Sequence, residues 1–194
     1  MTSTYNDDIW LSLGELNRQP DMRLVELATT AARDRSVLDC CCGDGIYLLP
    51  LLSVTSAVVG ADSSAVALER AGRRCPEAKL VLADVDRELP LEDNSFDLVW
   101  CVDAIEHLVD TQTALSELRR VLRPGGELIV ATPDHGLMRR FSLSLAGWNR
   151  HFDPFSPHLR FYTRGSLSQA LQNCGFEPRV ERHNGMLVAR ALRP

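Results

Sequence analysis

The chain has 194 residues, of which 45% are hydrophobic, and its formal net charge is -5. This size and apolar content suffice for one core, so we expect residues 1–194 to form a single domain. The acidic balance and the absence of a long Lys/Arg run disfavour a nucleic-acid partner, and no segment has the roughly 18 apolar residues of a membrane span. Residues 1–10 are polar and lack the features of a secretory signal, so the expected location is cytoplasmic.

Short apolar runs alternate with helical patterns along the chain. The runs have the length of strands and are apolar on both faces, which is typical of a parallel sheet covered on both sides. Five such runs occupy 36–41, 57–62, 78–84, 96–103 and 126–133. Apolar residues at helical spacing occupy 21–34, 63–75, 110–122 and 164–176. This order predicts an α/β fold with a doubly wound, mostly parallel sheet.

The C-terminal residues have a different pattern. Two strand-like runs at 178–183 and 186–192 are separated by Asn184 and Gly185. Asn-Gly is a strong signal for a two-residue hairpin, because both residues tolerate the positive φ of a type I′ turn. The sheet is therefore expected to have seven strands and to end in an antiparallel β-hairpin.

Residues 134–161 do not fit the alternation. They hold several aromatic residues, three histidines and two prolines, and a loop of this length in a compact domain is often functional. They follow the fifth run, at the carboxyl edge of the sheet, where open α/β folds bind ligands. We interpret 134–161 as a partly helical substrate cap, with a loop that only covers the core as the alternative.

The stretch VLDCCCGDG at 37–45 ends the first run in a glycine turn, and we expect a helix to open there. Gly43 and Gly45 allow a sharp turn and close approach to a ligand. Asp39, Asp62 and Asp84 end the first three runs. Each acid alone is more often a helix cap or a surface residue. Together they suit a ligand with an ammonium group, a ribose and an adenine amine.

As a set, these motifs resemble those of class I S-adenosylmethionine-dependent methyltransferases, of the small-molecule group that includes ubiquinone- and menaquinone-pathway enzymes. The first family motif, D-x-G-x-G-x-G, corresponds to residues 39–45, with Cys41 at the position of the first glycine. The fourth- and fifth-strand motifs correspond to FDLVWCVDAIEHL and LRPGGELIVATP. The resemblance runs from about Leu24 to the C-terminus and implies a Rossmann-like methyltransferase fold.

The resemblance also implies an activity and a set of binding residues. The expected reaction is direct methyl transfer from S-adenosyl-L-methionine to an O, N or C atom of a small-molecule acceptor, with S-adenosyl-L-homocysteine as the product. A homodimer is left open, and no metal-binding residue is expected. The residues assigned to cofactor binding are Asp39, Cys40, Cys41, Gly43, Gly45, Asp62, Ser63, Asp84, Val85, Cys101 and Val102.

A histidine is the expected general base if the acceptor must lose a proton, because neutral imidazole accepts protons near pH 7. The catalytic candidates are His107, just past the fourth run, His135, after the fifth, and His158, within the cap segment. The sequence does not choose among them. Arg160 and Tyr162 are candidate contacts for an acidic or phenolic acceptor, and packing at a helix start explains them equally well.

The six cysteines lack the spaced pairs of a zinc site and are expected to be free thiols. Cys40, Cys41 and Cys42 are expected to fill small buried spaces. The departure at Cys41 leaves open a non-catalytic S-adenosylmethionine-binding partner or regulatory subunit. A nicotinamide dehydrogenase is disfavoured, because Leu48 stands where the third glycine of its fingerprint is required. The absence of an N/D-P-P-Y motif after the fourth run disfavours methylation of nucleobase amines.

Overall fold

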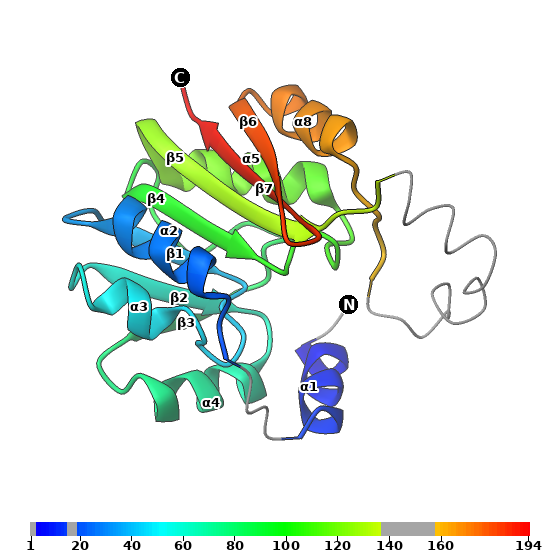
Figure 1. The fold of residues 1–194 in the computed structure, drawn as a ribbon. Coiled ribbons are helices and arrows are strands. Elements are labelled where there is room, and N and C mark those ends of the chain that lie inside the picture. Colours follow the sequence, from blue (N-terminus) through cyan, green and yellow to red (C-terminus); the bar gives the residue numbers. More distant parts are fainter. Residues whose placement is uncertain (1–2, 15–18, 137–157) are drawn as a thin grey trace.

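The computed structural model describes residues 3–14, 19–136 and 158–194. Strands and helices alternate through most of this range (Figure 1). The helices are α1 (Ser3–Ser12), α2 (Met22–Ala32), α3 (Leu48–Leu52), α4 (Ala65–Arg74), α5 (Thr111–Val121) and α8 (Arg164–Asn173). The strands are β1 (Val37–Cys40), β2 (Val58–Asp62), β3 (Lys79–Leu82), β4 (Phe96–Val102), β5 (Leu122–Pro133), β6 (Glu177–His183) and β7 (Met186–Leu192).

The strands form one seven-stranded sheet in the order β3-β2-β1-β4-β5-β7-β6. The first five strands pair in parallel, whereas β7 pairs antiparallel with both β5 and β6. The expected mostly parallel sheet with a terminal antiparallel hairpin is therefore confirmed. Strands β2 and β3 are added on one side of β1, and β4 and β5 on the other. The strand order therefore reverses between β1 and β4, and open α/β sheets bind ligands at such a switch point.

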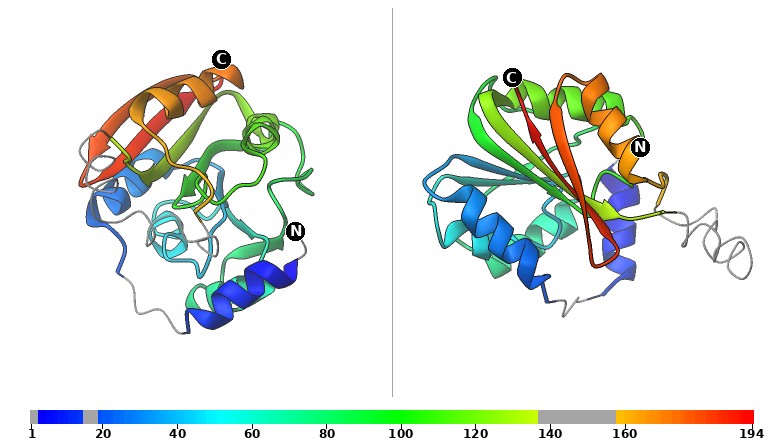
Figure 2. Two further views of the ribbon diagram at one scale, coloured as in Figure 1. Left: turned by 90° about the vertical axis from the view of Figure 1, so that its right-hand side faces the viewer. Right: turned by 45° about the horizontal axis from the view of Figure 1, so that its top comes forward.

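Helices cover both faces of the sheet, as expected for a doubly wound fold (Figure 2). On one face, Leu38, Val99 and Val130 belong to a core cluster that includes residues of α5 and α8. On the other face, their strand neighbours belong to a second cluster, with residues of α2, α3 and α4. Successive strand residues thus point into different cores, which explains why the strands are apolar on both faces.

Local sequence signals set the helix and hairpin boundaries. The Ser64 hydroxyl caps α4 by accepting a hydrogen bond from the Ala67 N–H, and Thr163 starts α8 in a capping box with Ser166. Asn184 and Gly185 have φ values of 46° and 78°, the left-handed conformations that the predicted type I′ turn requires.

Two boundaries near the parallel strands differ from the sequence prediction. The helix expected directly after the glycine turn starts only at Leu48, because Gly43 and Gly45 have positive φ values of 55° and 77° that α-helix does not allow. Strand β5 starts at Leu122 rather than after the Pro-Gly-Gly segment. The segment pairs with the end of the chain, although Gly125 has a positive φ of 78°: the Gly125 N–H donates to the Arg193 carbonyl oxygen at 2.7 Å, and the Arg193 N–H donates to the Gly126 carbonyl oxygen at 2.9 Å.

The proposed cap falls largely on residues 137–157, which lie outside the described residues. Its flanks are described: residues 134–136 follow β5, and residues 158–163 lead into α8. None of the described helices is long and apolar enough to cross a membrane.

Candidate functional site

The carboxyl ends of β1, β2, β4 and β5 meet at one edge of the sheet, because these strands are parallel. This edge carries the glycine turn after β1, Asp62 at the end of β2, and the histidine-bearing segments after β4 and β5 (Figure 1). The topology therefore brings together most of the candidate residues of the sequence.

The glycine turn has a left-handed backbone at three alternate positions. Cys41, Gly43 and Gly45 have φ values of 58°, 55° and 77°. A non-glycine residue in this region is disfavoured by about 1–2 kcal/mol, so the turn stores strain at Cys41. A Cβ atom built on Gly45 would lie 3.1 Å from the Cβ of Ala71, which shows that the turn packs directly against α4. Glycine at this position allows that approach.

Asp62 ties the glycine turn to the start of α4. Its Oδ2 accepts a hydrogen bond from the Gly43 N–H and its Oδ1 accepts one from the Ser64 N–H, both at 2.9 Å. The side chain is 8% exposed, and burial raises the pKa of its carboxyl group to about 7. Each carboxylate oxygen retains a further acceptor position, so Asp62 can also accept from two ligand hydroxyl groups.

Asp39 is a buried carboxyl group with unused hydrogen-bonding capacity. It is 3% exposed, and its Oδ2 has no hydrogen-bond partner among the described residues. Burial raises the pKa of Asp39 well above its ordinary value. A buried acceptor without a partner is costly in the free protein, and a cationic ligand would satisfy it. That Asp39 meets an ammonium group stays a prediction.

Four of the remaining cofactor candidates differ in their hydrogen-bond partners and in their burial. Ser63 accepts a hydrogen bond from the Asn6 side chain at 2.7 Å, and Asp84 accepts one from the Asp86 N–H at 3.1 Å. Val85 and Val102 are buried in different core clusters, on opposite sides of the sheet.

Among the cysteines of this region, Cys40, Cys42 and Cys101 are buried, whereas Cys41 is only partly buried, so the expectation of a buried side chain is wrong for Cys41. The Cys41 thiol shares hydrogen bonds with the thiols of Cys101 and Cys40, which lower the pKa of Cys41 and raise the pKa of its two partners. Cys40 and Cys101 are 1% and 2% exposed and belong to a core cluster. All six cysteines are free thiols, in agreement with the expectation from the sequence.

Helix α1 also reaches the site, which the sequence did not indicate. The Asp7 carboxylate accepts a hydrogen bond from the Ser64 hydroxyl at 2.6 Å and one from the Val66 N–H at 3.2 Å, so it adds a second cap to α4. A Cβ atom built on Gly43 would lie 2.8 Å from Cζ2 of Trp10. The Trp10 ring thus lies directly on the glycine turn.

Two histidine candidates are brought together and the third packs elsewhere. The rings of His107 and His158 make an edge contact with centroids 4.7 Å apart. His135 is 4% exposed and packs edge-on against Phe161, with centroids 4.9 Å apart. One of its ring nitrogens lies 3.1 Å from the Pro133 carbonyl oxygen. The pair formed by His107 and His158 is therefore better placed to meet a ligand than His135 is.

Arg160 and Tyr162 have structural partners. The Arg160 guanidinium donates to the carbonyl oxygens of Leu108, at 3.2 Å, and Val109, at 2.5 Å. Tyr162 is buried, and its hydroxyl oxygen lies 3.4 Å from the Thr111 hydroxyl oxygen. These contacts support the packing explanation for both residues over acceptor binding.

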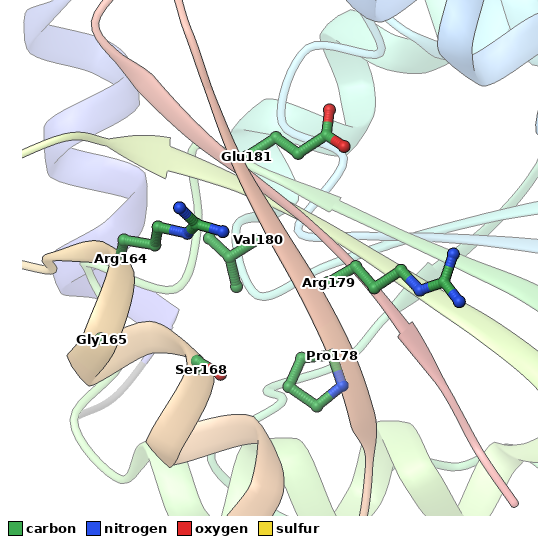
Figure 3. Close-up of a pocket in the computed structure, with 7 residues that line it drawn as sticks. All are labelled: Arg164, Gly165, Ser168, Pro178, Arg179, Val180 and Glu181. Carbon is green, nitrogen blue, oxygen red and sulfur yellow. The ribbon is translucent and has the colours of Figure 1, made fainter.

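Two hollows of the described surface lie away from the carboxyl edge. One, of about 580 Å³, lies between α8 and β6, and Arg164, Ser168 and Arg179 are among its lining residues (Figure 3). The other, of about 400 Å³, lies at the amino edge and is lined in part by Asp34 and Asp97. Neither hollow includes a residue of the glycine turn, where the Trp10 ring covers Gly43. The chemistry of the carboxyl edge, rather than the size of a cavity, identifies the candidate site.

Comparison with known proteins defines the class to which this fold and site belong. A family model described as "Methyltransferase domain" matches residues 38–130. A solved S-adenosylmethionine-dependent methyltransferase from Aquifex aeolicus shares the fold, with a TM-score of 0.73, 19% identity and coverage of 97% of this chain and 98% of that one.

Two curated relatives are similar in sequence. A probable S-adenosylmethionine-dependent methyltransferase of Mycolicibacterium smegmatis is 34% identical over 143 residues, which are 74% of this chain and 52% of the relative. A demethylmenaquinone methyltransferase of Renibacterium salmoninarum is 35% identical over 125 residues, 64% of this chain and 52% of the relative. The chain thus spans about half the length of these relatives. It belongs to the class I S-adenosylmethionine-dependent methyltransferases.

Proposed function

We propose that the chain transfers a methyl group from S-adenosylmethionine to an O, N or C atom of a small-molecule acceptor. The observation that carries this proposal is the unpartnered Oδ2 of buried Asp39, beside a strained glycine turn that Asp62 holds in place. These two carboxyl groups fit two polar parts of the cofactor, its amino-acid tail and its ribose.

The proposed contacts follow from the chemistry of each residue. Asp39 pairs with the ammonium group of the tail, and Asp62 accepts from the ribose hydroxyl groups while it keeps its bonds to the backbone. Asp84 accepts from the adenine amine. Gly43 and Gly45 let the backbone approach the ligand closely. S-adenosylmethionine supplies a methyl group on a positively charged sulfur, which is a good leaving group without help from the protein.

The protein's further contribution is positioning and, where the acceptor requires it, removal of a proton. We assign proton removal to the pair formed by His107 and His158, because the structure places these rings in contact just past the end of β4. His135 stays a weaker candidate, since its burial against Phe161 separates it from solvent.

The small size of the acceptor is supported by chemistry rather than by a described pocket. The net charge of -5 does not suit a polyanion, and a similar protein is named as acting on demethylmenaquinone. The atom that accepts the methyl group is left open, as is a homodimer. The cytoplasmic location expected from the sequence stays a prediction.

Transfer of labelled methyl groups tests the proposal. The purified chain is incubated with methyl-labelled S-adenosylmethionine and a panel of phenols, amines and enolisable carbon acids, beside the Asp62→Asn variant as a control. We expect label in at least one acceptor and a strong loss in the variant. Binding of the cofactor without transfer to any acceptor class would instead favour the alternative, a non-catalytic binding partner.

A further inference from the structure

A cluster of metal-ligating side chains lies just past the end of β4. One carboxylate oxygen of Glu106 and one ring nitrogen each of His107 and His158 all lie within 4.8 Å of one another. Glu106 is buried, and both histidines are half-buried. Among the described residues this is the one group of His, Cys, Asp and Glu side chains with such spacing, and it contains none of the cysteines.

The backbone fixes this arrangement across a long gap in sequence. The N–H groups of Leu159 and Arg160 donate to the Glu106 carbonyl oxygen at 2.8 and 3.0 Å. The Arg160 guanidinium then donates to the Leu108 and Val109 carbonyl oxygens. Four hydrogen bonds thus hold the segment that carries His158 against the segment that carries Glu106. Preorganisation of this kind is what a ligand-binding group of side chains needs.

A hydrogen bond from Thr132 orients the Glu106 side chain. The Thr132 hydroxyl donates to its Oε2 at 2.8 Å, and Glu106 is only 1% exposed. A carboxylate has about four lone-pair positions, so this bond is compatible with ligation of a cation. Hydrogen bonds from such outer partners typically orient metal ligands.

We propose that Glu106, His107 and His158 bind one divalent transition-metal ion. Two imidazoles and one carboxylate are the ligand set of several catalytic zinc sites and of the facial triad that holds Fe²⁺. Calcium and magnesium prefer all-oxygen sites and do not suit two nitrogen ligands. Ligand atoms about 2.0–2.2 Å from one ion lie roughly 3.0–3.5 Å apart, so ligand atoms within 4.8 Å of one another need to approach by no more than about 1.8 Å.

Three protein ligands leave at least one coordination position for another oxygen or nitrogen. The consequence for catalysis rests on the proposed function: a hydroxyl-bearing acceptor would fill that position. An acceptor hydroxyl held there loses its proton to solvent more readily. Its oxygen then bonds to the methyl carbon as the carbon–sulfur bond breaks and leaves its electron pair on sulfur. The two imidazoles would then act as ligands rather than as bases.

Cobalt titration tests the binding of the ion. The tag-free full chain is treated with a chelator, dialysed and titrated with Co²⁺, and the visible absorption of the bound ion is recorded. We expect saturation at one equivalent and loss of the bands when one equivalent of Zn²⁺ is added. His158→Gln should weaken Co²⁺ binding by at least about tenfold, and Thr132→Val by about 10- to 100-fold, through loss of the outer hydrogen bond.

His183→Gln is the matched control, because it removes an imidazole outside the cluster and should leave Co²⁺ binding unchanged. Circular dichroism checks that each variant is folded. If His158→Gln does not fold, the Co²⁺ affinity of Thr132→Val tests the proposal instead. The proposal is overturned if the wild-type chain shows no saturable binding, or if folded cluster variants bind Co²⁺ as tightly as the wild type. Neither readout uses S-adenosylmethionine, so failure of the proposed function and failure of the metal site are distinguishable.

Discussion

Replacement of Asp62 by asparagine should change how the stability of the protein depends on pH. In the folded chain, burial raises the pKa of Asp62 to about 7 from an ordinary value of 3.8. Between these two values the folded state binds more protons at this site than the unfolded state does. Asp62 therefore contributes stability that is fully present below pH 3.8 and is lost as pH rises through about 7.

The size of the effect follows from the same two values. Each pKa unit corresponds to about 1.36 kcal/mol. Integration of the difference in bound protons from pH 5 to pH 8 gives about 3 kcal/mol of stability lost through this one group. An asparagine side chain cannot titrate, and its amide nitrogen cannot accept the hydrogen bond from one of the two backbone N–H groups. The Asp62→Asn variant should therefore lose about 1–3 kcal/mol through the missing hydrogen bond. This cost does not depend on pH, and the variant lacks the pH-dependent contribution of the wild-type carboxyl group.

Urea unfolding at pH 5, 6, 7 and 8 measures the free energies. Titrating groups that do not face Asp62 contribute equally to both proteins and cancel in the difference between wild type and Asp62→Asn. The pKa of Asp39, which the Asp62 charge helps to raise, should fall in the variant and changes the difference in the same pH range. That difference should shift by about 3 kcal/mol in favour of the variant from pH 5 to pH 8. Asp34→Asn is the matched control, since Asp34 is exposed and asparagine tolerates its left-handed backbone. Parallel pH profiles for wild type and Asp62→Asn would refute the reasoning.

The same measurement reports on the cofactor. Hydrogen bonds from ribose hydroxyl groups favour the ionised form of a carboxyl group and lower its pKa. Saturating S-adenosylhomocysteine should therefore reduce the pH-dependent difference between the two proteins. An unchanged difference in the presence of bound ligand would show that the ligand does not contact Asp62.

Three further predictions concern the turn and the histidines. Gly43→Ala places a methyl group 2.8 Å from the Trp10 ring. Its left-handed backbone should cost at least about 1–2 kcal/mol of stability, and the contact with the ring should add a further cost. Thermal unfolding should show that Trp10→Ala, combined with Gly43→Ala, removes this further cost. Cys41→Gly should melt about 2–4 °C above Cys41→Ala, because only glycine relieves the strain, by about 1 kcal/mol net; equal melting temperatures would refute the strain. At least one of His107→Gln and His158→Gln should lower kcat by about 10²- to 10⁴-fold, while the Kd of S-adenosylhomocysteine stays unchanged. An unaltered kcat in both variants would show that neither histidine transfers a proton.

The sheet and its edge were predictable because their signals are local. The apolar runs before Asp39 and Asp62 have the length of buried strands, and the parallel order alone places their ends at one edge. The Asn184-Gly185 turn fixed the terminal hairpin through its backbone preference. Gly175, near the end of the last helical pattern, has a φ of 79° and lies just past α8, as is common for a glycine after the end of a helix.

Contacts between distant segments were not predictable in this way. Asp7 caps α4 from 57 residues away, and nothing in the α1 sequence indicates a partner. Trp10 lies on Gly43 only because α1 packs beside α4 (Figure 2). Likewise, Glu106 and His158 are drawn together by backbone hydrogen bonds from Leu159 and Arg160, which carry no pattern in the sequence.

The central claim, that the carboxyl edge binds S-adenosylmethionine through Asp39, is tested most directly by calorimetric titration. The wild-type chain, Asp39→Asn and the control Asp34→Asn are each titrated with S-adenosylmethionine and with S-adenosylhomocysteine. We predict one site per chain, an affinity about 10- to 150-fold lower in Asp39→Asn through loss of a charge-assisted hydrogen bond, and no change in Asp34→Asn. The absence of binding by folded wild-type protein, or equal affinities for wild type and Asp39→Asn, would contradict the claim.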